Sequence, residues 1–429
     1  MLLRSLISAS LLGCTSLALC PALVTPAHAQ NPVLANAAYY YTGPATINTD
    51  LGNNDVVIGR SPGNPPNLTN DVNLGTTAQT AYAVTVVNGA QLNFSSQNPY
   101  TGVEVFNRNT LNIQGGIFGF GVSSHDNSVV NVSGGQGGYP SVNFSPNSFR
   151  ISGDGNSTVN FNGATYCNRI DVQGSATLNV NGVNSNGTRL EVAYGLGSST
   201  VNINTNSDTQ TVLVGQNSSL NYNAGKSGSV YIGSTGANKI FGGTIGSIVA
   251  QSGVVDVFGG SISGLLTGEA GSGTSYNSTA NIRGGSLSSL LNGDFSTVNI
   301  YGGNIGDVNT FENAVTNIYG GTIAPNTLLA RDSGVVNLYG TGFALSSVIG
   351  TGSDGFGNYN SYNLTGTLQD GTPLSTTFRD YAGGNQIGGA SSPLRFNAIV
   401  AAPEPGSAAL LGIGFAGISG VIARRKRKA

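Results

Sequence analysis

The body of the chain repeats a short unit in which apolar and polar residues alternate. Its clearest copies span residues 298–303, 316–321 and 336–340, and each places an Asn between two apolar residues ahead of a Gly. Period-two alternation with β-branched residues predicts a half-buried strand, and no part of the body shows sustained helical periodicity. The pattern therefore predicts short strands rather than amphipathic helices.

Further copies of the unit continue towards the N-terminus. Residues 255–260 and 280–285 keep a Gly-Gly pair, and weaker copies keep only an Asn between apolar neighbours, at Asn73, Asn93, Asn112, Asn131, Asn160, Asn179, Asn202 and Asn221. Many neighbouring copies are 17 to 20 residues apart. Strands this short cannot bury a core alone, but stacked copies can share one.

These features predict an all-β fold, a parallel β-helix (solenoid) that is expected to be right-handed and to have roughly fourteen turns over residues 71–350. Alternation points Val298 and Ile300 into the core and Asn299 and Tyr301 towards solvent. Gly and Asn are expected at the corners because they adopt positive φ at low cost.

Both open ends of such a solenoid need a cap against edge-to-edge association. Residues 30–70, which include Pro62, Pro65 and Pro66, are expected to cap the first turn. Residues 351–402 are expected to form the C-terminal cap and a linker. Within them, residues 364–368 and the Asp370-Gly371 turn suggest a hairpin.

Stacking also accounts for the unusual composition. The chain has 65 Gly and only 8% charged residues, whereas ordinary domains have about 25% charged residues. Equivalent residues on successive turns lie about 4.8 Å apart, so a repeated charge would repel its copies while Asn, Ser and Thr form hydrogen-bonded ladders. Residues 30–402 hold 11 basic and 18 acidic residues, which argues against a nucleic-acid partner.

Residues 1–29 have the features of a secretory signal peptide. Arg4 precedes an apolar run over residues 6–24, and the small residues Ala27 and Ala29 stand before Gln30. This pattern predicts cleavage after Ala29 by signal peptidase. A lipoprotein signal ending at Cys14 is the alternative, and either signal exports the chain.

Residues 403–429 form a second targeting segment. Pro403, Glu404 and Pro405 precede an uncharged span over residues 406–423, and the chain closes with Arg424, Arg425, Lys426, Arg427 and Lys428. A helix over that span is about 27 Å long, enough to cross a bilayer. The basic cluster would then set the membrane topology by staying in the cytoplasm. A plain tail anchor and a processed signal both fit these residues.

The three parts in this order resemble the PEP-CTERM sorting signal of Gram-negative bacteria. The resemblance implies export, recognition by a membrane-embedded, exosortase-like enzyme and cleavage near Pro403-Glu404-Pro405. It also implies a final place at the cell surface or in the extracellular matrix, with exopolysaccharide as a candidate partner. The Gly-Gly repeats further resemble the β-helical bodies of autotransporter adhesins.

Few side chains in the body suit catalysis or metal binding. After removal of the signal peptide, one His (His125) and one Cys (Cys167) remain. They are too few for a His/Cys metal site or an intrachain disulfide. We therefore expect no metal and no cofactor. His125 is expected in an exposed turn, and Cys167 is expected to face the core.

Carboxylates are the remaining catalytic candidates. In two series of carboxylates, the sequence spacing is close to the length of one turn: Asp154, Asp171 and Glu191, and Asp294, Glu312 and Asp332. Glycosidic bond cleavage needs two carboxylates about 5 to 10 Å apart, which adjacent turns can supply. Calcium binding and simple solvated turns are the alternatives.

An aromatic column is the candidate glycan-binding site. Phe258, Tyr301, Tyr319 and Tyr339 occupy equivalent outward positions, and Arg283 interrupts the series. Such rings can stack on sugar faces beside Asn side chains, or they can simply stack on each other. Taken together, the sequence indicates a non-enzymatic, exported repeat protein with a structural or adhesive role. A β-helical polysaccharide lyase or hydrolase is the alternative.

Overall fold

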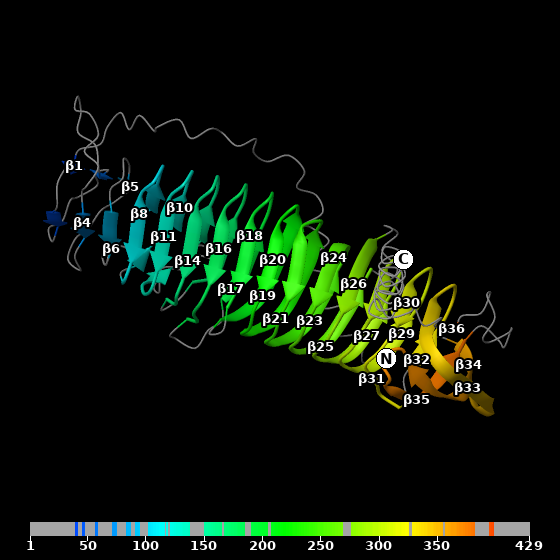
Figure 1. Ribbon diagram of the computed structural model, residues 1–429. Coiled ribbons are helices and arrows are strands. Elements are labelled where there is room, and N and C mark those ends of the chain that lie inside the picture. Colours follow the sequence, from blue (N-terminus) through cyan, green and yellow to red (C-terminus); the bar gives the residue numbers. More distant parts are fainter. Residues whose placement is uncertain are drawn as a thin grey trace, which may run out of the picture.

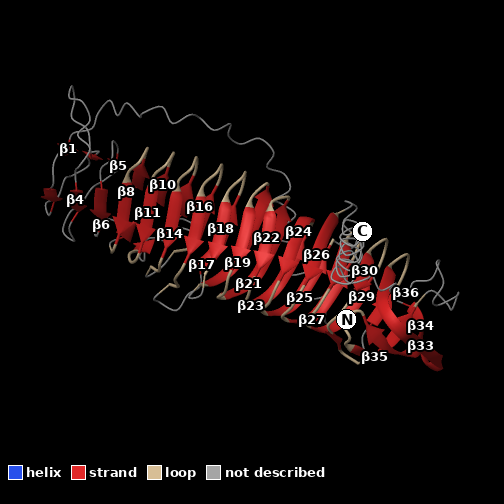
Figure 2. Cartoon of the chain, in the orientation of Figure 1, coloured by secondary structure: helices blue, strands red, loops and turns tan. Residues whose placement is uncertain are grey.

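The chain forms an elongated stack of β-strands (Figure 1). The computed structural model describes residues 39–41, 45–47, 56–58, 71–74, 83–86, 91–94, 102–115, 117–118, 121–137, 150–164, 167–184, 190–204, 207–268, 276–325, 328–354, 357–381 and 394–398. Every regular element in these ranges is a strand (Figure 2). None of the described residues forms a helix of the length and apolarity that a membrane span requires.

One row of parallel strands carries the Asn residues of the repeat, and we call it the ladder row. Its members are β2 (Ala45–Ile47), β4 (Asp71–Leu74), β6 (Gln91–Phe94), β8 (Thr110–Ile113), β11 (Val129–Val132), β14 (Thr158–Phe161), β16 (Thr177–Val180), β18 (Thr200–Ile203), β20 (Ser219–Tyr222), β22 (Ala237–Ile240), β24 (Ser252–Val257), β26 (Asn277–Ile282), β28 (Thr297–Ile300), β30 (Val315–Ile318) and the start of β33 (Val335–Asp354). The register pairs Asn73 with Asn93, Asn93 with Asn112 and so on to Asn221.

The strands that follow these along the chain form a second row, also parallel. Its members are β1 (Tyr39–Tyr41), β3 (Val56–Ile58), β5 (Ala83–Val86), β7 (Gly102–Val105), β10 (Gly121–Ser124), β13 (Arg150–Gly153), β15 (Arg169–Val172), β17 (Leu190–Gly195), β19 (Asp208–Gln216), β21 (Lys226–Ser234), β23 (Thr244–Ala250), β25 (Ser261–Thr267), β27 (Ser286–Asn292), β29 (Asn304–Thr310), β31 (Thr322–Ile323) and β32 (Leu328–Ala330). Two short strands, β9 (Ile117–Phe118) and β12 (Gln136–Gly137), pair separately.

The predicted all-β solenoid is confirmed. About ten turns separate β8 from β30, because ten successive parallel pairings join them. The sequence predicted roughly fourteen turns over residues 71–350, and β4, β6 and β33 extend the same row beyond these ten turns. The right-handed coil stays a prediction, and the helix expected over residues 406–423 lies outside the described residues.

The alternating residues of both rows enclose one apolar core. Val298 and Ile300 are fully buried as predicted, while Asn299 between them is only partly covered. In the second row Ile245 and Ile248 are likewise buried. From Val103 onward, each described turn therefore contributes a few aliphatic side chains to one shared core, as the shared-core argument requires.

Left-handed backbone at the corners explains the glycines. Gly303 has φ of 97°, and a Cβ at this position would lie 2.9 Å from the carbonyl oxygen of Gly285 on the preceding turn. The second Gly of a Gly-Gly pair thus meets both a positive φ and a close backbone neighbour. Asn107 and Asp126 adopt positive φ at another corner, where the register aligns them.

A three-stranded antiparallel cap follows the last turn. β33 runs on past the ladder row to pair with β34 (Gly357–Leu368), which pairs with β35 (Pro373–Asp380). The turn between β34 and β35 contains Asp370 and Gly371, so the expected hairpin is confirmed. β35 then covers β32, and β36 (Leu394–Ala398) covers β33, so each row ends under a strand of the cap.

Asp370 fixes this turn to the solenoid. Its carboxylate accepts hydrogen bonds from the backbone N–H groups of Gly321, at 2.8 Å, and Thr372, at 2.9 Å. Partial burial opposes the charged form, but these hydrogen bonds outweigh it and hold the pKa of Asp370 below its ordinary value. At the other end, β1, β2 and β3 lie within the range expected to cap the first turn, and all three pair in parallel with the two rows.

Candidate functional site

The outward face of the ladder row carries a ladder of side-chain amides in two runs. Each Asn donates from Nδ2 to Oδ1 of the Asn one turn back, at distances of 2.7 to 2.9 Å from Asn131 to Asn221. The ladder resumes with Asn299, Asn317 and Asn337 at 2.8 to 2.9 Å. Lys239 and Asp256 occupy the two intervening turns.

Two residues further along each strand, a second outward column changes its chemistry midway. On four successive turns it is polar, with Asn162, Asn181, Asn204 and Asn223 joined by hydrogen bonds of 2.6 to 2.9 Å. On the next six turns it contains Phe241, Phe258, Arg283, Tyr301, Tyr319 and Tyr339, which we call the aromatic column. Along the ladder row, this outward column thus has an amide segment followed by the aromatic column.

The rings of the aromatic column are stacked nearly parallel. Tyr301 and Tyr319 have centroids 4.9 Å apart at an interplanar angle of 9°, and Tyr319 and Tyr339 are 4.2 Å apart at 18°. Phe241 and Phe258 form a second stack at 5.2 Å and 10°. The four rings selected from the sequence therefore lie together, and the structure adds Phe241 to them.

Phe241 was detectable from the sequence. The segment Ile240-Phe241-Gly242-Gly243 has the same apolar, aromatic and Gly-Gly order as the best repeats, but Lys239 replaces the Asn that marked the other copies. The repeat pattern defined by that Asn therefore does not include this turn.

Arg283 joins the two ring stacks instead of breaking the column, which corrects the sequence interpretation. Its guanidinium carbon lies 5.9 Å from the Phe258 centroid and 5.0 Å from the Tyr301 centroid. Both distances fall in the cation–π range. The guanidinium also lies 3.9 Å from a carboxylate oxygen of Asp256. Arg283 thus sits between the rings as a positively charged member of the same column.

The column is open to solvent along much of its length. Phe241, Phe258 and Tyr301 are 46%, 41% and 40% exposed. Tyr319 is more covered, and burial together with its contacts to Tyr339 raises the pKa of Tyr319 to about 12. Its hydroxyl therefore remains a neutral hydrogen-bonding group at physiological pH.

The two carboxylate series behave differently. Asp171 pairs in register with Ser152 and Tyr194, so Asp154 and Glu191 do not stack on it, and that predicted alignment is wrong. The spacing misled because these turns are 19 and 23 residues long, whereas the carboxylates are 17 and 20 residues apart. Asp171 instead lies between the guanidinium groups of its ion-pair partners Arg150 and Arg169.

Asp294, Glu312 and Asp332 do lie on successive turns at one corner. All three have positive φ, and the backbone N–H of Asp294 donates to Glu312 Oε2 at 2.8 Å. Burial raises the pKa of Glu312, and the charges of Asp294 and Asp332 add to the rise. Across the described ranges, no three His, Cys, Asp or Glu side chains are grouped to hold a metal ion.

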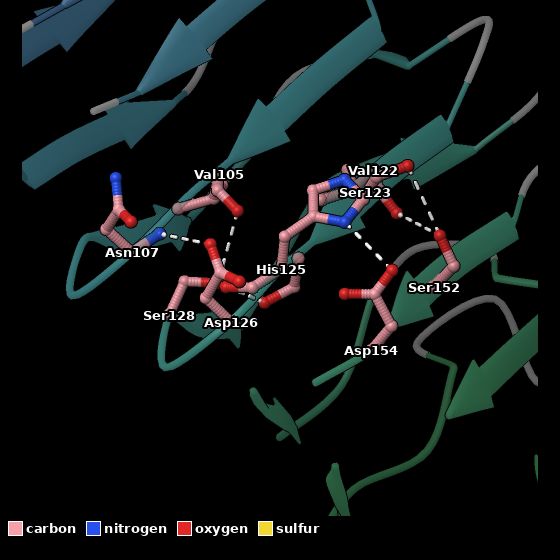
Figure 3. A network of polar contacts seen from close by, with 10 residues as sticks. Val105, Asn107, Val122, Ser123, His125, Asp126, Ser128, Ser152 and Asp154 are labelled. Carbon is pink, nitrogen blue, oxygen red and sulfur yellow. Dashed lines mark hydrogen bonds and ion pairs between the residues drawn. The ribbon is translucent and has the colours of Figure 1, made fainter. Parts of the chain in front are cut away.

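His125 is less exposed than the sequence predicted. Its ring stacks on Phe106 with the ring centroids 4.5 Å apart. Nδ1 lies 3.0 Å from Asp154 Oδ2 (Figure 3). The preceding turn supplies Phe106 and the following turn supplies Asp154, which sequence position alone did not reveal. Burial lowers the pKa of His125, but the hydrogen bond and charge of Asp154 outweigh burial and leave it raised.

Cys167 faces the core, as predicted. It is fully buried, and burial raises the pKa of its thiol. The side chain of Asn184 holds its backbone through hydrogen bonds of 3.1 Å to both the N–H and the carbonyl. The thiol therefore serves as a small apolar group.

Fold and surface together define the class: a parallel β-solenoid repeat protein with a laddered amide and aromatic face. Residues 401–428 match the PEP-CTERM protein-sorting motif, so the chain carries the C-terminal signal that the sequence suggested. This motif implies export and sorting to the cell surface by an exosortase-type system. No curated protein and no solved structure matches the chain. Pro403, the basic cluster and the signal-peptide residues lie outside the described residues.

Proposed function

We propose that this protein is a non-enzymatic structural or adhesive element of the cell surface or extracellular matrix, and that its aromatic column binds exopolysaccharide. The observation that carries the proposal is the exposed run of stacked rings beside an ordered amide ladder. Aromatic faces offer sugars an apolar stacking surface, and neighbouring amides supply both hydrogen-bond donors and acceptors.

The architecture supports a display role. Because every turn pairs with the next, the rod holds its surface groups at a fixed spacing over its whole length. A sorting signal at the C-terminal end would release or anchor the rod at the outer surface after signal peptidase and an exosortase-like enzyme have acted. Membrane contact in this proposal is made by residues 406–423.

The binding test is affinity electrophoresis of the full chain in gels containing acidic or neutral polysaccharides. Wild-type protein should be retarded, and Y301A/Y319A/Y339A should bind about tenfold more weakly or worse because it loses the stacking faces. The matched control is N181A/N204A/N223A, which changes the same outward position on the amide segment. Equal retardation of wild type and the Tyr variant would refute the aromatic column as the site.

An enzymatic role is the second candidate, favoured by the aligned trio of Asp294, Glu312 and Asp332. A lyase or hydrolase would shorten the polysaccharide, and Glu312→Gln would abolish that shortening. Reducing-end release by wild type that disappears in this variant would overturn the non-enzymatic proposal. Retardation without release favours adhesion.

Sorting is tested separately by fractionation of cells that produce P403A/E404A. We expect the variant to stay unprocessed in the membrane fraction, while wild type reaches the surface or the medium. Unchanged processing and location would show that this segment acts only as a plain membrane anchor.

A further inference from the structure

A polar cavity lies in the C-terminal cap, away from the aromatic column. It has a volume of about 430 Å³, and its lining includes Thr351, Ser353, Asn358, Tyr359, Asn360 and Asp380. These residues come from β33, β34 and β35. The volume lies within the range of about 300 to 1,000 Å³ typical of small-molecule sites.

The strand register explains why the cavity forms. β33 shifts against β34 between Thr341 and Ala344, between Leu345 and Val348, and between Val348 and Gly350. Extra residues in one strand bend it and increase its twist. After Gly350 the pairing is regular again, so the bend falls just before the lining residues.

The same register gathers the polar side chains on one face. Thr351 pairs with Asn360, which pairs with Asp380, while Ser353 pairs with Asn358. Residues directly opposite each other, and residues two apart on one strand, point to the same side of a sheet. Two hydroxyls, two amides and one carboxylate therefore share a surface.

This surface runs from the exposed residues Thr351, Ser353 and Asn358 to the inner side of the cap at Asp380. Asp380 pairs with Ala330, a core residue of the last turn, and is itself only 1% exposed. Phe378, two residues earlier on the same side of β35, is fully buried and closes the core. The cavity thus opens where the apolar interior ends, and a buried carboxylate forms part of its wall.

The cap also holds its aromatic and cationic groups in place. A Cβ at Gly352 would clash with the Tyr359 hydroxyl oxygen, so the ring lies across this glycine. The Arg379 guanidinium carbon is 4.9 Å from the Tyr359 centroid, and the Tyr381 ring is 5.3 Å away. Arg379 and Tyr359 alternate with Asp380 and Asn360, so their side chains leave the strands on the other side of the sheet, although Tyr359 also borders the cavity.

The chemistry of the lining selects the ligand class. Hydroxyl and amide groups both donate and accept hydrogen bonds, and the carboxylate accepts. Among the described residues, the cavity lining includes the Asp380 carboxylate and no Lys or Arg, which disfavours a phosphate or sulfate. A compact neutral ligand with many hydroxyl groups satisfies these residues best.

We propose that this cavity binds a neutral saccharide unit at the C-terminal end of the rod. The site is separate from the aromatic column and does not depend on the column binding glycan. Asn358, Asn360 and Asp380 pair with the sugar hydroxyls, and Thr351 and Ser353 complete the hydrogen bonding.

The test is saturation-transfer difference NMR on the full chain with glucose, galactose, mannose and N-acetylglucosamine as separate probes. At least one probe should receive saturation from wild type. N358A/N360A should weaken its binding about tenfold or more through loss of two hydrogen-bonding side chains. S353F, which fills the cavity without removing either amide, should also abolish binding.

Y301A/Y319A/Y339A is the matched control and should bind the same probe as wild type does. Absence of transfer to all four probes, or unchanged affinity in N358A/N360A or S353F, would overturn the cap site. Loss of the probe only in the Tyr variant would place small-sugar binding on the aromatic column instead. Polysaccharide retardation reports on the column independently, so failure of one site leaves the other measurable.

Discussion

Backbone conformation at single corner residues decides which side chains the rod tolerates there. Asp294, Glu312 and Asp332 hold left-handed φ angles of 54° to 59°, a region that favours Gly and Asn. Stacking at one corner also brings their carboxylates towards each other, and burial raises the pKa of Glu312 while both neighbours add to the rise. The charged form of Glu312 is thus disfavoured even though this corner faces solvent.

Glu312→Gln should stabilise the protein at neutral pH and flatten its pH dependence. A raised pKa means that the folded state binds the proton more tightly, so the free energy of unfolding falls as pH rises from about 4.3 through the raised value. Gln keeps an oxygen to accept the Asp294 N–H. Because the group is partly exposed and screened by solvent, the gain should be below about 1 kcal/mol.

Urea midpoints of wild type and Glu312→Gln at about pH 4 and pH 7 measure this effect. Glu191→Gln, on the second row and outside the trio, is the control and should leave the pH dependence as it is. A lower midpoint for Glu312→Gln at neutral pH would contradict the assignment.

At the scale of elements, the strands of the ladder row are tied together by side chains as well as by backbone. Asn299 donates to Asn281 at 2.8 Å and accepts from Asn317 at 2.9 Å, so it links three successive strands. An amide is suited to this position because it donates and accepts at once without charge. The same reasoning explains why the neighbouring column uses either amides or stacked rings.

Asn299→Ala should lower the free energy of unfolding by about 1 to 2 kcal/mol, because it breaks two hydrogen bonds and leaves Asn281 and Asn317 without this partner. Asn313→Ala is the matched control. Its side chain is exposed in a turn, so the change should stay within about 0.5 kcal/mol. Equal denaturant midpoints for the two variants would show that the amide ladder contributes nothing to stability.

At the scale of the whole molecule, the cap separates a finite rod from an open-ended stack. β35 covers β32 through Leu328 and Phe378, and β36 covers β33 through Val336 and Leu394. Without these strands the last turn would expose unpaired backbone groups and aliphatic core residues, the features that promote edge-to-edge association.

Deleting residues 357–380 should therefore convert the protein to larger assemblies. Sedimentation velocity measures the change, and circular dichroism checks that the strands of the rod persist. Thr351→Ala, in the same cap but outside the contact with β32, should sediment as wild type does. A deletion variant that keeps its strands and the wild-type sedimentation coefficient would show that the cap is not what limits association.

The sequence by itself determined the repeat, the all-β class, the inward and outward residues and the sorting motif. It could do so because alternation and near-constant spacing are local properties, and the Asn positions of the repeat pair in register as predicted. Residue spacing did not predict the carboxylate alignment where turns lengthen, as at Asp171. The reason is that strand register depends on how many residues each corner contains.

Only the tertiary structure decided which side chains meet. It placed Arg283 between two ring stacks, brought Asp154 and Phe106 to the ring of His125, and formed a polar cavity beside Asp380. These contacts join residues from neighbouring turns or from the bulged cap. Their geometry follows from stacking and strand bending, which a linear pattern of apolar and polar positions does not encode.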